Sequence, residues 1–349
     1  MRFSTASEIL ESAINFQIDN RANCRDAQMV VPYLNGGVGI GKTTSVKDAV
    51  KTVAQKRGVE MGFTQVNLAE YPPEEVAGWF MPNDDKDAMH RLAPDWLPKQ
   101  GTYGVLFFDE AAQAIGATQN ILSRILNEWC IGEHQIPDTW AIVAAGNRMS
   151  DRAGTNVMPT HVRDRLCFLD VEANLEDTIA YFMANRVHEK ICAFLRFKPE
   201  MLWKFDRDAN SFPTPRGWER VSSVIGQWSL SPMAERETVS GIVGLPAATE
   251  FYAFCAVYDE VPDPRELIKN PETSVIPERP DVLYAVCSAL ASYATEDNIK
   301  AITQYLRRIP QAEFAAFVIK DAASKLPNIK QNPAVRDWVI NGGGKEVLV

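Results

Sequence analysis

The stretch GGVGIGKTT, from Gly36 to Thr44, contains the residues whose types and spacing are best suited to a binding or catalytic role. It matches the pattern G-x-x-x-x-G-K-S/T, in which glycines let the backbone curl so that several N–H groups face one phosphate. Lys42 would bring a positive charge to the β- and γ-phosphates, and Thr43 would offer a hydroxyl to Mg²⁺. We therefore predict a loop that binds a nucleoside triphosphate, formed by Gly36, Gly37, Val38, Gly39, Ile40, Gly41, Lys42, Thr43 and Thr44.

A pair of carboxylates follows the apolar run 105–108 in the sequence GVLFFDEAAQA. Two acids at the mouth of a buried strand are costly unless they have a function there. Asp109 would accept a hydrogen bond from Mg²⁺-bound water, which makes it a metal-site residue together with Thr43. Glu110 would polarise the water that attacks the γ-phosphate. The alternative is a surface turn with two solvated acids, and the nearby phosphate loop argues against it.

A third stretch, WAIVAAGNRMSDRAG (140–154), begins as an apolar run and ends it at Asn147. If this run is the strand beside the carboxylate strand, Asn147 emerges next to Asp109 and Glu110. A neutral amide at that position can orient the lytic water without adding charge. An asparagine in an exposed loop is the alternative.

The elements that must position these residues are strand-like runs that alternate with helical patterns between about residues 29 and 171. Alternation of this kind favours a parallel sheet with helices on both faces. Pro32 lies within the first run, where it removes a ladder donor and conflicts with an interior strand position. The helix after the glycine-rich loop has one apolar face, and Gly58 suits its C-terminal cap. The predicted strands span 29–34, 63–68, 105–110, 140–147 and 167–171.

Composition narrows the class of protein. A chain of 349 residues with 46% hydrophobic content can form two domains, and its net charge of −9 argues against a whole-surface attraction to nucleic acid or anionic lipid. The N-terminus lacks the apolar core of a signal peptide, and no apolar window is long enough to span a bilayer. The six cysteines form no C-x-x-C pair, which favours reduced, buried thiols over a zinc site. We therefore expect a cytoplasmic protein without membrane contact.

Taken in order, the phosphate loop, FFDE, AAGN and a later PTPRGWERVS resemble an AAA+ ATPase over about residues 33–222. The passage LNEWCIGEHQIPDTWAIVAAGNRMSDRAG is most similar to the MoxR-like branch, and the region beyond residue 282 resembles phage- or prophage-type members more loosely. The resemblance implies an α/β fold: an AAA+ P-loop core with a parallel five-stranded sheet between helices, followed by an all-α lid and a helical C-terminal region. It also implies Mg²⁺-dependent hydrolysis of ATP by a homo-oligomer, expected to be a hexameric ring.

Four segments follow from this resemblance and from the composition along the chain. Residues 1–172 are expected to form the nucleotide-binding core and residues 173–260 the helical lid. The polar run around 261–282 contains several prolines and is interpreted as an extended connector. Residues 283–349 return to helical periodicity and end in the tail NGGGKEVLV, which is either mobile or a partner-docking strand.

Five arginines are candidates for further roles. The resemblance makes Arg165, in MPTHVRDRLCFL, the best match to an arginine finger that reaches the neighbouring subunit's γ-phosphate, with Arg163 as the runner-up. It makes Arg216, which follows Pro215 at an expected helix start, the sensor-2 arginine of the lid. The remaining two, Arg148 and Arg152, are expected to hold the loop after Asn147 or to line a subunit interface, and Arg152 is also a secondary catalytic candidate.

The stretches VNLAEYPPEEVAGWFMPN and HRLAPDWLPKQG carry aromatic residues before the carboxylate strand. In AAA+ rings such insertions often face the central pore, where Trp79, Phe80 and Trp96 could grip a polypeptide. They could equally be buried anchors of the insertion, which is the interpretation we prefer.

The function that these residues favour is a ring-forming ATPase that remodels or matures a partner protein. MoxR-like ATPases typically act with a von Willebrand factor A-domain partner, although the sequence itself does not show the client. A DNA-directed motor or loader is an alternative, but no basic stripe stands out between residues 283 and 349. A motor subunit of a metal chelatase is a third hypothesis. A small-molecule kinase fits least, because two carboxylates and an asparagine suit hydrolysis by water.

Overall fold

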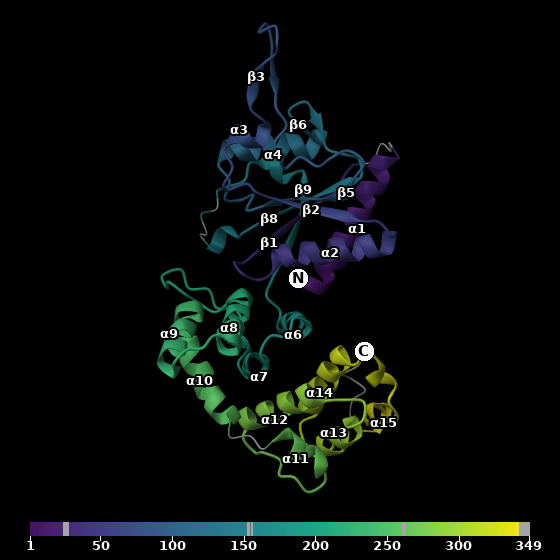
Figure 1. Cartoon of the computed structure of the whole chain (residues 1–349), viewed down its shortest axis with the longest axis vertical. Coiled ribbons are helices and arrows are strands. Elements are labelled where there is room, and N and C mark those ends of the chain that lie inside the picture. Colours follow the sequence, from purple (N-terminus) through teal and green to yellow (C-terminus); the bar gives the residue numbers. More distant parts are fainter. Residues whose placement is uncertain (24–27, 152–153, 155, 260–262, 342–349) are drawn as a thin grey trace. The chain divides into compact units, whose positions relative to one another are not determined.

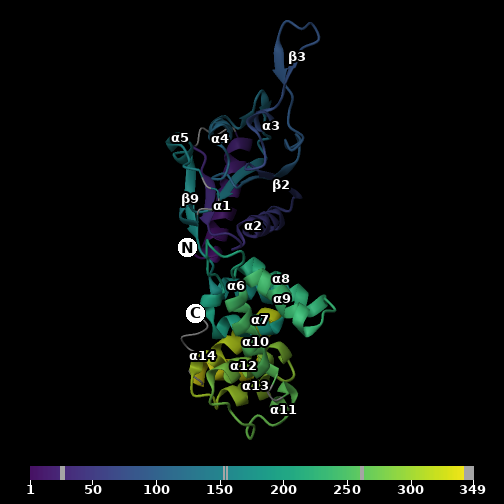
Figure 2. The same ribbon diagram turned by 90° about the vertical axis from the view of Figure 1, so that its left-hand side faces the viewer.

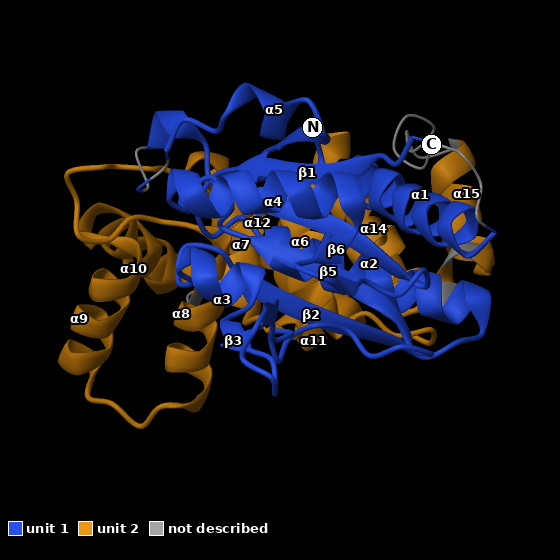
Figure 3. Ribbon diagram, turned by 90° about the horizontal axis from the view of Figure 1, so that it is seen from above, with its two compact units in different colours: residues 1–173 blue, residues 174–349 orange. Residues whose placement is uncertain are grey.

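The computed structural model describes residues 1–23, 28–151, 154, 156–259 and 263–341. The chain forms two compact units, residues 1–173 and 174–349, which Figure 3 shows in different colours. The first unit contains the glycine-rich loop, both predicted carboxylates and Asn147. The second unit is helical throughout its described part.

A parallel five-stranded sheet is the centre of the first unit, as the sequence predicts (Figure 1). Its strands lie in the order β2-β5-β8-β1-β9, so β8 separates the strand that precedes the glycine-rich loop from the strand that ends on the carboxylates. The strands are β1 (Val31–Gly36), β2 (Met61–Asn67), β5 (Tyr103–Asp109), β8 (Trp140–Gly146) and β9 (Leu166–Val171).

Helices cover both faces of this sheet (Figure 1). One face packs against α1 and α2, and the other packs against α3, α4 and α5. The alternation of side chains along β5 shows why, because Leu106 and Phe108 belong to the core cluster under α4 while Val105 and Phe107 are buried on the opposite face. The helices are α1 (Phe3–Ala22), α2 (Lys42–Arg57), α3 (Pro73–Ala77), α4 (Gly116–Glu128) and α5 (Thr160–Arg163), with a 3₁₀ turn at Met149–Asp151.

Pro32 lies inside β1, and the strand register explains why it is tolerated there. It faces Cys167 of β9, while pairing of β1 with β8 begins one residue later, at Tyr33 and Ala144. The missing N–H therefore falls before the ladder with β8 starts.

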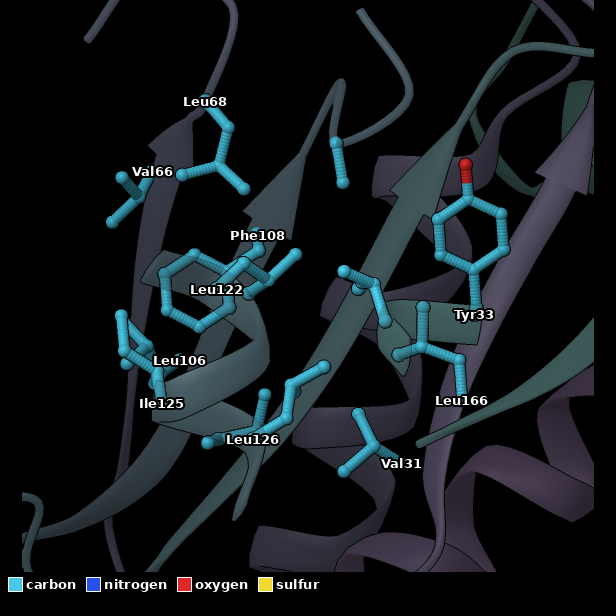
Figure 4. Close-up of a cluster of buried hydrophobic side chains, with 14 of the residues drawn as sticks. Val31, Tyr33, Val66, Leu68, Leu106, Phe108, Leu122, Ile125, Leu126 and Leu166 are labelled. Carbon is cyan, nitrogen blue, oxygen red and sulfur yellow. The ribbon is translucent and has the colours of Figure 1, made fainter. Parts of the chain in front are cut away.

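The contact between Tyr33 on β1 and Gly146 on β8 limits the side chain at residue 146. Figure 4 shows the Tyr33 hydroxyl pointing away from Val31, toward the carboxyl ends of the strands. A Cβ atom at Gly146 would lie 2.0 Å from this hydroxyl oxygen and 3.1 Å from the ring carbon that bears it. No side chain fits there unless Tyr33 moves.

We expect Gly146→Ala to lower the free energy of unfolding by about 1–3 kcal/mol through this overpacking. Adding Tyr33→Phe should restore part of the loss, because the closest contact disappears while the ring carbon stays. Chemical denaturation of the single and double variants measures the coupling. Gly116→Ala is the matched control, since a Cβ atom there meets nothing within 4 Å. Equal effects of both glycine substitutions would contradict this account.

Two hairpins extend from the first unit: β3 (Phe80–Pro82) with β4 (Met89–Arg91), and β6 (Cys130–Ile131) with β7 (His134–Gln135). The β3–β4 hairpin projects from the unit in both side views (Figures 1 and 2). Trp79 and Phe80 at its base are 56% and 53% exposed, so the expectation that they are buried anchors is wrong. An isolated two-stranded hairpin has no second layer to cover them. Trp96 does pack as an anchor, edge-on against Phe108.

The second unit holds its helices together with two groups of buried residues. The aromatic rings of Phe194, Trp218 and Phe251 contact one another where α7, α8 and α10 meet. A separate cluster, which includes Tyr305 and Trp338, joins the helices from α11 to α15. The helices are α6 (Leu175–Ala184), α7 (Glu189–Phe197), α8 (Pro215–Gln227), α9 (Pro232–Val243), α10 (Leu245–Asp259), α11 (Pro264–Lys269), α12 (Pro280–Tyr293), α13 (Ile299–Leu306), α14 (Ala312–Lys325) and α15 (Pro333–Asn341), with 3₁₀ turns at Pro199–Met201 and Pro327–Gln331.

The segment 261–282, predicted as an extended connector, contains the helix α11. The Asp263 side chain accepts a hydrogen bond from the N–H of Arg265, and Pro264 occupies the first turn, so the local sequence favours a helix start. Leu267 on α11 is buried in the cluster shared with the C-terminal helices. The segment is therefore partly folded into the second unit, and the further division into lid and C-terminal region stays a prediction.

Two smaller expectations concern cysteines and membranes. Cys130, Cys192, Cys255 and Cys287 are buried free thiols and Cys167 is half-buried, while Cys24 lies outside the described residues. Among the described residues, every helix is too short or too polar to cross a bilayer.

Candidate functional site

The glycine-rich loop connects the end of β1 to the start of α2. Gly41 caps the helix at a φ of 104°, a left-handed conformation that strongly favours glycine. The backbone N–H groups of Gly39, Gly41 and Thr43 donate to no acceptor among the described residues. Unpaired N–H groups at a helix N-terminus form a cradle that fits a phosphate.

Lys42 is the best-anchored side chain of this loop. Its Nζ donates to the carbonyl oxygens of Gly36 at 2.8 Å and Gly37 at 2.9 Å, and to Oδ1 of Asn147 at 2.7 Å. The residue is 9% exposed. The ammonium is therefore already held at the mouth of the phosphate cradle, in contact with the predicted water-orienting amide.

Asp109 joins three other residues at the end of β5. Its Oδ2 accepts from the Thr43 hydroxyl at 3.0 Å and from Nε2 of Gln65 at 2.9 Å, and its Oδ1 accepts from the N–H of Glu110 at 3.0 Å. A hydroxyl and a carboxylate at this spacing suit Mg²⁺, which prefers oxygen ligands and keeps several waters. Within the described part of the chain, no cluster of three or more His, Cys, Asp or Glu forms an all-protein metal cage, and a magnesium site shared with phosphates does not require one.

Glu110 stands in a strained turn directly after β5. Its φ of 53° is left-handed although it is not glycine, and the side chain is half-buried. The next residue fixes the turn, because the N–H of Ala111 donates to the carbonyl of Ala145 on β8 at 2.9 Å. Strain of this kind costs of order 1–3 kcal/mol and is concentrated at functional sites.

Strand order brings these residues together. Because β8 lies between β1 and β5, the carboxyl ends of all three strands meet at one edge, which carries Lys42, Asn147 and Asp109. Crevices at the carboxyl ends of parallel strands are where ligands bind in open α/β sheets. The arrangement can bind a triphosphate and a divalent cation and can activate a water molecule.

Two residues of this edge escaped the sequence reasoning. Gln65 bonds directly to Asp109, and nothing distinguished it from the other polar residues of the run 63–68. Tyr33 is 1% exposed, and burial together with the Asp109 carboxylate raises its pKa, so it stays a neutral phenol. An aromatic residue in a core strand gives no sign that its hydroxyl reaches this edge.

Arg163 and Arg165 lie at the other end of the strands, where β1 and β9 begin. They precede β9, whose first residue, Leu166, pairs with Val31 at the start of β1. The five-residue run from Val31 to the loop spans about 17 Å at the usual rise of a strand. Nη1 of Arg165 donates to the carbonyl of its own helix residue His161 and its Nε is buried without a partner among the described residues, whereas Arg163 is exposed.

The remaining predicted arginines are distributed over both units. Nη2 of Arg148 donates to the carbonyl of Val171 at 2.7 Å and contacts Glu172, so it ties the loop after β8 to the end of β9. Arg216 is exposed in the first turn of α8. Thr214 caps this helix, because its Oγ1 accepts a hydrogen bond from the N–H of Gly217. The action of Arg216 on a nucleotide stays a prediction. Arg152 lies outside the described residues.

Comparisons with solved structures give distant similarities. No family model and no curated protein matches the sequence. Among solved structures, a RuvB mutant from Thermotoga maritima is 15% identical, with 75% of this chain and 74% of that chain covered and a TM-score of 0.36. NtrX from Brucella abortus is 14% identical, with 92% and 63% covered and a TM-score of 0.34. PCH-2 from C. elegans is 11% identical, with 71% and 67% covered and a TM-score of 0.34. Similarity at this level does not place the chain in a family.

Proposed function

We propose that this protein is a Mg²⁺-dependent ATPase of the AAA+ class. The observation that carries the proposal is the bond from Lys42 to Asn147 across the β1–β8 pair, beside the Thr43–Asp109 bond at 3.0 Å. Three sequence motifs that are far apart along the chain thereby supply one phosphate cradle, one cation ligand set and one water-orienting amide. A site with these parts suits hydrolysis of a triphosphate.

Each residue then has a distinct role. The backbone N–H groups of the loop and the Lys42 ammonium bind the phosphates, while Thr43 and Asp109 hold Mg²⁺, which neutralises phosphate charge when bound. Glu110 accepts the proton of the attacking water, and Asn147 orients that water. Arg216 is assigned to the phosphates as a lid residue on the strength of the sequence resemblance.

The place of the arginine candidates supports a homo-oligomeric ring. Arg163 and Arg165 lie at the amino ends of the strands, whereas the glycine-rich loop of the same subunit follows the carboxyl end of β1. A catalytic role for either arginine therefore requires a second subunit. A guanidinium supplied in trans can accelerate phosphoryl transfer by about 10³–10⁵. The exposed Arg163 reaches a neighbour without rearrangement, whereas Arg165 must first leave the carbonyl of His161.

The finer assignment rests on the sequence resemblance. We assign the protein to the MoxR-like branch, as a cytoplasmic hexamer that remodels or matures a client protein and acts together with a von Willebrand factor A-domain partner. The exposed Trp79 and Phe80 on the projecting hairpin offer an apolar surface for a polypeptide client. Purification from the native host with identification of bound proteins tests the partner.

Hydrolysis by mixed oligomers tests the ring. Glu110→Gln and Arg165→Ala protomers should each be inactive alone, for lack of the base and of the neighbour's cation. In a random equal mixture, about a quarter of the interfaces join an intact base to an intact finger, so activity should return to roughly that fraction of wild type. Phosphate release with Mg²⁺ and ATP, together with the mass of the oligomer, provides the measurement.

The same mixture with Arg163→Ala decides between the two arginines. Glu110→Gln mixed with Lys42→Ala is the control, because both changes damage the subunit's own site and no interface is restored. If neither arginine variant regains activity on mixing although the oligomer forms, neither residue acts in trans.

A further inference from the structure

A cavity of about 400 Å³ lies within the second unit, in a part of the chain that the proposed ATPase site does not use. Three of the helices that line it each contribute two residues spaced four apart, so that both face the same side of their helix. The pairs are Cys192 and Arg196 on α7, Ser288 and Ser292 on α12, and Asp321 and Lys325 on α14. The rest of the wall comes from Met183 on α6, from residues 186–188 between α6 and α7, and from Glu189 at the start of α7.

Ser288 is the first indication that the cavity holds a ligand. The residue is 4% exposed, lines the cavity, and its Oγ has no hydrogen-bond partner among the described residues. A serine inside a helix commonly donates back to the carbonyl four residues earlier, and this one does not. A buried hydroxyl without a partner is unfavourable unless something in the cavity bonds to it.

Arg196 is the second indication, because it is fixed in place with N–H groups to spare. Its Nη2 contacts both carboxylate oxygens of Asp321, its guanidinium lies 4.8 Å from the centre of the Phe317 ring, and the two charged side chains are 10% and 8% exposed. Burial raises the pKa of Asp321 to about 6, while Arg196 opposes the rise. Nε and Nη1 of Arg196 donate to no described residue, so their N–H groups are available to anionic oxygens.

The charge around the cavity has a positive excess. Asp321 is neutralised by Arg196, so the unpaired charges that line the cavity, among the described residues, are Arg186 and Lys325 against Glu189. This local excess stands in a chain whose net charge is −9. Positive charge concentrated in a hollow attracts a negative ligand.

We propose that this cavity binds a small anion whose carboxylate or phosphate oxygens accept hydrogen bonds from Arg196, Ser288 and Lys325. Its volume lies within the range of small-molecule pockets, about 300–1,000 Å³, so a metabolite-sized ligand fits and a polypeptide does not. The site belongs to the second unit alone and is independent of the nucleotide.

Calorimetric titration of the full chain with inorganic phosphate and, separately, with citrate tests the site. The experiment uses a Lys42→Ala background so that phosphate binding at the glycine-rich loop is removed. We expect saturable binding of at least one probe, and the tighter probe identifies phosphate or carboxylate as the preferred group. Lys325→Ala should weaken that binding about tenfold, and Lys300→Ala, which removes an exposed lysine of the same unit outside the cavity, should leave it unchanged.

Ser288 variants separate binding from folding. Ser288→Ala should lower the affinity for the anion about tenfold. Its unfolding midpoint should equal or exceed that of the parent, because the substitution removes an unpaired buried hydroxyl. Ser288→Leu should fill the hollow and eliminate binding. The proposal is overturned if neither phosphate nor citrate binds saturably, or if Lys325→Ala and Ser288→Ala leave the affinity unchanged. Equal losses from Lys300→Ala and Lys325→Ala would also overturn it, because they would indicate general surface attraction.

Discussion

Replacement of Lys42 by alanine is expected to weaken ATP binding by about 100-fold or more, which follows from removing a buried charge that bonds directly to phosphate. The structure adds a second reason. Lys42 also anchors its own loop, because its Nζ bonds to the carbonyls of Gly36 and Gly37 and to Asn147. Alanine leaves these three acceptors without their donor, so the cradle loses its shape along with its charge.

Calorimetry with ATP and Mg²⁺ measures the affinity, and the shift in unfolding temperature with ligand gives an independent readout. Lys51→Ala is the matched control, since Lys51 lies on the same helix with its side chain 73% exposed and pairs with Asp48 on the helix itself. It should bind ATP like wild type and should show the full shift. An unchanged affinity in Lys42→Ala would remove Lys42 from the site, and a similar loss in Lys51→Ala would attribute the effect to the net charge of the helix.

The sequence was sufficient to predict the sheet and the glycine-rich loop that leads into α2, for a physical reason. Most of the strands are short apolar runs bounded by turns, and their apolar residues indicate in the sequence that these runs are buried. The glycine-rich loop depends on local geometry, since Gly41 needs a left-handed φ and Lys42 follows it directly into the helix. Local requirements of this kind are visible in the sequence.

Contacts between distant strands were not visible in the same way. The bond from Gln65 to Asp109 and the approach of Tyr33 to Gly146 depend on the register of β2 against β5 and of β1 against β8. A polar residue in one strand gives no information about which neighbour it will face. The edge of the site was therefore predicted from its motifs, while the residues that support it were missed.

In the second unit, helical periodicity gave the elements and left their partners unknown. The spacing of Ser288 and Ser292 places both on one face of α12, but only tertiary packing shows that α7 and α14 enclose that face. The proline-rich segment was wrongly predicted to be extended throughout, because proline favours both an open linker and the first turn of a helix. At Pro264 the Asp263 side chain caps the chain, and this favours the helix. The exposure of Trp79 likewise depends on the hairpin having no covering layer.

Replacement of Glu110 by glutamine is expected to leave ATP affinity unchanged and to lower the rate of hydrolysis by about 10²–10⁴, the usual contribution of a general base. Glutamine keeps the size and the left-handed backbone of this turn and loses only the ability to accept a proton. Phosphate release at saturating ATP measures the rate, and calorimetry measures the affinity. Glu60→Gln is the control, because it changes an exposed acid that precedes β2, at the other end of the sheet.

A glycine at the same position separates strain from chemistry. Since Glu110 has a φ of 53°, Glu110→Gly should raise the free energy of unfolding by about 0.5–1 kcal/mol while hydrolysis falls as far as in Glu110→Gln. A residue kept at a conformational cost and needed for turnover is one that the fold holds for its carboxylate. If Glu110→Gly is both active and more stable, the carboxylate has no part in hydrolysis, and if it is destabilised, the turn is not strained. Wild-type turnover in Glu110→Gln would end the role of this residue as the base even if the glycine variant behaves as expected.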